Sequence, residues 1–171
     1  MTRLPGPYAA WASWLEAFGR GEDLSSGHLP AMTAELGPDM TERLFNLVVQ
    51  AFQHRQRRWH ETLQRDMRAV TGAPAGATTA IAAALHNARG LLAPLRELAE
   101  LPQLPVGLRD SLRDALSDTV RSAQRTLEGS ARDTPAAFQA VIRANSLIPG
   151  LTQPRPAPPA PRPVASRRVI L

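Results

Sequence analysis

The sequence contains one long stretch, Asp39–Val70, of about thirty residues that include neither glycine nor proline. Apolar residues recur along it at steps of three and four, which places their side chains on one face of a helix. Such a helix extends roughly 45–50 Å at about 1.5 Å per residue. A single apolar stripe is not stable alone in water, so other helices must cover it. The stripe consists of Leu44, Leu47, Val48, Ala51, Phe52, Trp59, Leu63, Met67 and Val70.

Four further segments have the pattern of amphipathic helices that could supply this cover. They span residues 5–20, about 78–100, 108–127 and 134–148. Gly90 and Pro94 interrupt the second of them, because a proline ring removes a donor and crowds the carbonyl four residues earlier. A kink or a break into two helices is expected there. The sequence therefore predicts an all-α fold, an antiparallel helical bundle of four to five helices.

The composition changes after residue 148. Pro154–Pro163 contains six prolines in ten residues, which favours polyproline II. Residues 149–171 carry four arginines and no acid, whereas residues 1–148 carry 16 arginines and 15 acids and are close to neutral. We expect a helical bundle domain over 1–148 and a disordered or extended Pro/Arg-rich tail over 149–171, which ends in the apolar peptide Val169–Leu171.

The composition also limits the class of protein. The chain has no cysteine, which excludes disulfides and thiolate metal sites and is compatible with a reducing cytosol. No stretch has the apolar bulk of a transmembrane segment, so we expect a soluble, cytoplasmic protein. All 20 basic residues are arginine, as in the residue usage of a GC-rich coding sequence. The arginine count alone therefore does not indicate nucleic-acid binding.

A search for catalytic or metal-binding patterns finds none. The four histidines are scattered, and no Glu has a His three residues later. Asp110, Asp114 and Asp118 share one helix face, but Arg113 and Arg121 lie within ion-pair reach of them, which indicates a solvated charged face. We therefore expect no catalytic residue, no metal and no cofactor, and we predict that the chain is not an enzyme.

The first predicted helix carries half of the chain's aromatic residues. Tyr8, Trp11, Leu15 and Phe18 fall on one face, and Trp14 lies beside it. Two interpretations are open at this point. The helix packs on the bundle, because aromatic side chains bury large areas; alternatively, Trp11 and Trp14 bind a partner groove or an apolar surface.

The middle of the long predicted helix is rich in arginine. One interpretation is a solvated face on which Glu61 forms ion pairs with Arg57 and Arg65. The other is a patch that binds anions or nucleic acid. This candidate patch comprises Arg55, Arg57, Arg58, Arg65 and Arg68.

The end of the tail is a candidate binding peptide. An extended peptide can add to the edge of a sheet while alternate side chains, here Val169 and Leu171, fill pockets. The alternative is that these residues fold back on the bundle or have no role. The candidate partner-binding residues of the tail are Arg167, Arg168, Val169, Ile170 and Leu171.

These features favour a non-catalytic helical adaptor or scaffold subunit that binds a protein partner, in part through its C-terminal peptide. An uncovered part of the long stripe would also allow a homo-oligomer. The unequal amphipathic helices, the aromatic first helix and the Pro/Ala-rich tail resemble in texture the phasin group, which coats polyester granules. That resemblance implies a coat or accessory protein on an apolar granule or lipid surface. A third hypothesis is a nucleic-acid-binding protein that uses the arginines of the long helix and the tail.

Overall fold

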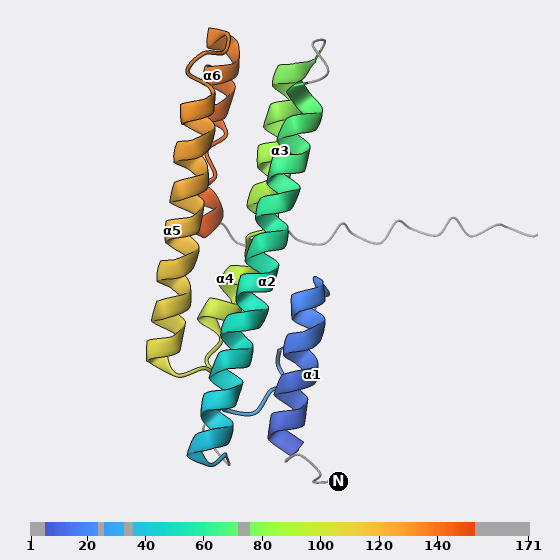
Figure 1. Ribbon diagram of the computed structural model, residues 1–171, viewed down its shortest axis with the longest axis vertical. Coiled ribbons are helices and arrows are strands. Elements are labelled where there is room, and N and C mark those ends of the chain that lie inside the picture. Colours follow the sequence, from blue (N-terminus) through green and yellow to red (C-terminus); the bar gives the residue numbers. More distant parts are fainter. Residues whose placement is uncertain (1–5, 24–25, 33–35, 72–75, 153–171) are drawn as a thin grey trace, which may run out of the picture.

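The computed structural model describes residues 6–23, 26–32, 36–71 and 76–152 (Figure 1). The predicted all-α antiparallel helical bundle is confirmed, and the described residues contain no strand. None of the described helices combines the length and apolar character needed to cross a bilayer. The elements are α1 (Gly6–Arg20), α2 (Pro38–Thr71), α3 (Ala77–Gly90), α4 (Ala93–Glu100), α5 (Val106–Ser130), α6 (Ala136–Ala144) and the 3-10 helix η1 (Ile148–Leu151).

The long helix α2 lies at the front of the bundle in Figure 1, and the other helices pack along it. Helices α3 and α4 run antiparallel to α2 behind it, α5 returns beside them, and α6 folds back along the upper end of α5. Helix α1 runs parallel to α2 and lies against its first half. The second half of α2 instead faces α3 and α5. The two halves of the long helix therefore have different neighbours.

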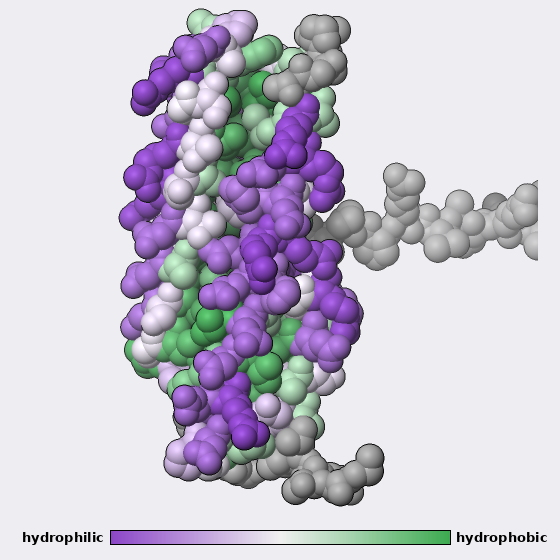
Figure 2. All heavy atoms as spheres, in the orientation of Figure 1, coloured by the Kyte–Doolittle hydropathy of each residue, from purple (hydrophilic) through white to green (hydrophobic). Residues whose placement is uncertain are grey.

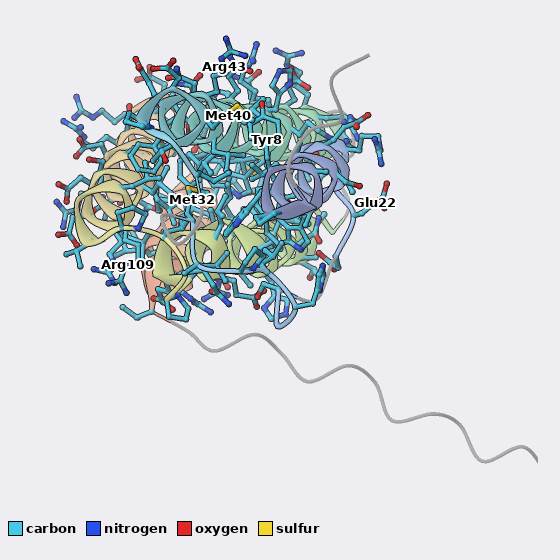
Figure 3. All side chains as sticks on the ribbon, turned by 90° about the horizontal axis from the view of Figure 1, so that it is seen from below. Tyr8, Glu22, Met32, Met40, Arg43 and Arg109 are labelled. Atoms are coloured by element: carbon cyan, nitrogen blue, oxygen red, sulfur yellow. The ribbon has the colours of Figure 1, made fainter. Side chains whose placement is uncertain are left out.

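The predicted stripe of α2 forms one wall of the core. Leu44, Val48, Phe52 and Leu63 are buried, whereas Met67 near the end of the helix is only partly buried. Burying side chains of this size contributes about 1.5–3 kcal/mol each relative to exposure, so the shared core accounts for why the helices associate. Figure 3 shows the bundle from below, with Met32 from the 26–32 segment among the helices and Arg43 pointing outward.

The predicted break near Pro94 is present. Helix α3 ends at Gly90 and α4 begins at Ala93. At this break the Leu92 amide donates to the carbonyl of Arg89, 3.2 Å away, instead of to the carbonyl of Ala88. The indole Nε1 of Trp59 on α2 donates to the Ala88 carbonyl instead, at 2.9 Å and in a buried position. A side chain of the long helix thus completes the hydrogen bonding of the interrupted one.

The packed body continues past the predicted domain boundary at residue 148. Helix η1 packs against α3, α4 and α5, and Gly150 is buried there. A Cβ added at Gly150 would lie 2.8 Å from Leu92 Cδ1 and 3.3 Å from Arg89 Cα, so this backbone packs closely against the α3–α4 junction, and a larger residue would displace the Leu92 side chain. Arg96 Nη1 also donates to the Gly150 carbonyl at 3.3 Å. These contacts hold the chain against the bundle through Leu151.

Candidate functional site

The two tryptophans predicted to bind a partner lie inside the bundle. Trp11 is fully buried and donates from Nε1 to the Pro30 carbonyl at 3.0 Å. Trp14 is 7% exposed, and its ring stacks on Phe18 with 5.2 Å between centroids. Of the two interpretations of this helix, the structure shows the first, in which α1 packs on the bundle. In this fold neither indole is accessible to a partner.

The five arginines of the predicted anion patch are divided by the structure. Arg55 is directed at the end of α1, and its side chain is only 11% exposed. Its Nη1 donates to the carbonyls of Phe18 at 3.1 Å and Glu22 at 2.9 Å, and its Nη2 pairs with Asp23 Oδ1 at 2.9 Å. The guanidinium also lies 4.7 Å from the centroid of the Phe18 ring. Arg55 therefore binds carbonyl groups at the helix C-terminus, where a cation is favourable.

Arg58 acts on the same helix end, because its Nη1 donates to the Arg20 carbonyl. Arg57, Arg65 and Arg68 are exposed on the rest of α2. The ion pairs predicted for Glu61 are not among those of the described residues. The predicted patch is thus not one continuous surface: two of its members hold α1, and three face solvent.

Replacing Arg55 with alanine is expected to lower the free energy of unfolding by about 1.5–3 kcal/mol, because several charge-assisted hydrogen bonds at a nearly buried position are lost. Urea denaturation followed by circular dichroism measures this change. Arg57 lies two residues further along α2 at an exposed position. Arg57→Ala should therefore stay within about 0.5 kcal/mol of the wild type. Equal effects of the two variants would contradict the assigned role of Arg55.

The acidic row on α5 forms one of its expected ion pairs. Arg113 Nη1 lies 2.9 Å from Asp110 Oδ1, and both side chains are about half exposed. No pair between Asp118 and Arg121 occurs among the described residues. Within the described ranges, no three His, Asp or Glu side chains are grouped so that they could hold a metal ion. This face of α5 is accordingly a solvated charged surface.

An apolar groove lies at the end of the bundle where α2 and α5 both terminate. It encloses about 350 Å³ between α2, α5 and α6, with Ile81 of α3 also lining it. Its volume falls in the range of roughly 300–1,000 Å³ that is typical of ligand sites. In Figure 2 apolar side chains are visible in the upper half of the molecule, between the polar surfaces of α5 and α2. We name it the α2–α5–α6 groove; its apolar lining includes Leu63, Met67, Val70, Ile81, Ala123, Leu127, Ala131, Phe138 and Ile142.

Small side chains of α5 and of the residue after it line part of this groove. The first half of α5 buries Leu112, Leu116 and Val120, whereas its second half presents Ala123 and, just beyond its end, Ala131. Sequence reasoning assigned the apolar lining residues to core stripes and missed the groove. The small residue Ala123 within an otherwise large apolar stripe was the one sequence feature that could have indicated unfilled volume here.

The two rims of the groove carry hydrogen-bonding groups. His60, Gln64 and Arg68 follow each other at four-residue spacing along the α2 rim, with 2.8 Å between His60 Nε2 and Gln64 Nε2. Arg68 Nη2 lies 3.5 Å from Gln64 Oε1. Thr126 and Ser130 line the α5 rim. Among the described residues that line the groove, Arg68 carries a guanidinium and none carries a carboxylate.

A second hollow, of about 570 Å³, lies between α1 and α2. Its lining is more polar and includes Glu16, Arg20 and Arg58. Glu16 and Arg20 form an ion pair at 2.9 Å, and Arg58 binds the α1 backbone. These groups already serve the packing of α1, so the α2–α5–α6 groove is the better candidate for a binding site.

The tail residues 167–171, predicted to bind a partner, lie outside the described residues. Among the described residues, the α2–α5–α6 groove is the candidate site. An apolar floor between helices with polar rims is typical of surfaces that receive an apolar side-chain cluster or an amphipathic helix. No protein-family model matches the chain, and comparisons with curated proteins and with solved structures find no significant similarity.

Proposed function

We propose that this chain is a non-catalytic helical adaptor that binds a protein partner in the α2–α5–α6 groove. The observation that carries the proposal is the groove itself, an apolar hollow of about 350 Å³ bordered by polar rims. Contiguous apolar surface open to solvent is characteristic of interaction sites. The scaffold around it is a packed bundle, so the site is preformed.

The composition of the groove supports a macromolecular partner that makes apolar contacts. Met67, Leu127 and Phe138 are only partly buried, so binding would remove further apolar area from water. Methionine adapts its shape easily, which suits a surface that packs against another protein. The predicted C-terminal peptide Val169–Leu171 remains a second proposed contact.

The proposal is tested by blocking the groove from its exposed rim. Thr126→Trp would place an indole over the hollow, while Ser122→Trp puts the same side chain on an exposed part of α5 outside it. We expect tagged wild type and Ser122→Trp to retain the same partner in a pull-down analysed by mass spectrometry. Thr126→Trp should reduce its recovery about tenfold or more, as for loss of a central contact. Equal recovery by all three proteins would refute the groove as the binding site.

The tail is tested separately with a chain that stops after Thr152. This end point preserves η1 and its contacts with α3, α4 and α5. A partner that is lost on truncation but retained by Thr126→Trp would place binding in the tail and contradict the proposed role of the groove.

A further inference from the structure

We infer that the occupant of the α2–α5–α6 groove is an amphipathic helix of the partner whose apolar face is bordered by Asp or Glu residues. This inference rests on the proposed function and specifies the chemistry of the partner. Three properties of the molecule carry it: the way in which the chain seats its own α1, the dimensions of the groove and the charge of its rim.

The packing of α1 is an example, within this chain, of an amphipathic helix seated along α2. Helix α1 packs along the first half of α2, with Gly19 close to Ala51 and with Trp11 fully buried. Arg55 of α2 borders this contact and pairs with Asp23, just beyond the end of α1. An arginine of α2 beside an apolar notch thus recognises an acidic residue that follows the seated helix.

The groove offers a comparable notch along the second half of α2. It follows α2 from His60 to Val70, which is about 15 Å at about 1.5 Å per residue, or close to three helical turns. Its walls are α2 and α5, with α6 closing one side. A helix lying between two others packs by placing its side-chain ridges in their grooves. Three turns with two or three apolar residues would therefore fill this space.

The guanidinium at the rim favours acidic residues beside the apolar face of the partner helix. Arg68 supplies a guanidinium on the α2 rim, and His60 and Gln64 supply further hydrogen-bonding groups there. On the α5 side, Glu128 is directed away from the groove, because it accepts a hydrogen bond from Gln124 at 2.7 Å and lines a depression with Arg132. A carboxylate flank on the occupant meets a cation and no lining carboxylate, whereas a basic flank would face Arg68.

The inference is tested with three synthetic helical peptides of 14 residues that share one apolar face of leucine and phenylalanine. Their flanking positions are all Glu, all Gln or all Lys. Fluorescence anisotropy with the full-length protein is expected to give at least about fivefold tighter binding for the Glu peptide than for the Lys peptide. This preference should shrink as salt is raised.

Two arginine variants distinguish the rim from the general charge of α2. Arg68→Glu is expected to abolish or reverse the preference, whereas Arg57→Glu, an exposed α2 position outside the groove, should leave it intact. An equal response to both variants, a preference for the Lys peptide, or failure of all three peptides to bind would overturn the inference.

The result can be separated from the test of the proposed function. If the Thr126→Trp block still abolishes capture of the partner but the peptides show no acidic preference, the groove remains the adaptor site and only the acidic helix is refuted. If Thr126→Trp has no effect on capture while the Glu peptide binds preferentially, the proposed function fails and the groove retains its preference for acidic helices.

Discussion

Replacing Trp11 with alanine is expected to lower the free energy of unfolding by about 3–5 kcal/mol. The indole is fully buried, so its removal leaves a cavity in the core between α1, α2 and the 26–32 segment. It also removes the donor of the 3.0 Å hydrogen bond to the Pro30 carbonyl. Equilibrium urea denaturation, followed by far-ultraviolet circular dichroism, measures the change.

A matched variant on the same helix separates this effect from a general weakening of α1. Tyr8 lies on the same face but is only partly buried, so Tyr8→Ala should cost about 1–2 kcal/mol. A loss of less than about 1 kcal/mol for Trp11→Ala would mean that α1 contributes little to the bundle. Such a result would favour the other interpretation of this helix, in which Trp11 binds a partner.

The helices could be predicted because their information is local. The stripe of α2 repeats at helical spacing, and the interruption at Pro94 follows from the ring of that residue alone. The all-α class and the break between α3 and α4 therefore followed from patterns within a few turns. The packing of η1 did not, because it depends on the lack of a side chain at Gly150 beside Leu92, two residues far apart in the sequence.

The roles of the arginines could not be predicted in the same way. Arg55 and Arg57 are two residues apart in one basic segment, yet one is nearly buried against α1 and the other is exposed. Their positions along α2 give their angle around the helix but not what lies opposite. Only the placement of the α1 C-terminus beside α2 distinguishes an arginine that holds the fold from one that is available for binding.

The groove is likewise a property of tertiary packing. Leu63 on α2 and Leu127 on α5 fit the apolar stripes of their own helices, and nothing in either stripe shows that space remains between them. Ala123 lines that space, one turn after the larger Leu116 and Val120 on the same face of α5. A sequence gives the volume of each side chain, but the volume of a hollow depends on which residues face each other.

The junction of α2 with the α3–α4 break leads to the second large expected effect, at Trp59. Trp59→Ala is expected to cost about 3–5 kcal/mol, because this residue is 3% exposed and its removal leaves a cavity. Trp59→Phe keeps most of the apolar volume but leaves the buried Ala88 carbonyl without its 2.9 Å donor, so it should cost about 1–3 kcal/mol. Urea denaturation of both variants gives the two values. The difference between them is the free energy of unfolding that an aromatic ring contributes at this position without the hydrogen bond. If Trp59→Phe were as stable as the wild type, another group would have to satisfy the Ala88 carbonyl, and the Trp59 hydrogen bond would not contribute to stability at the α3–α4 break.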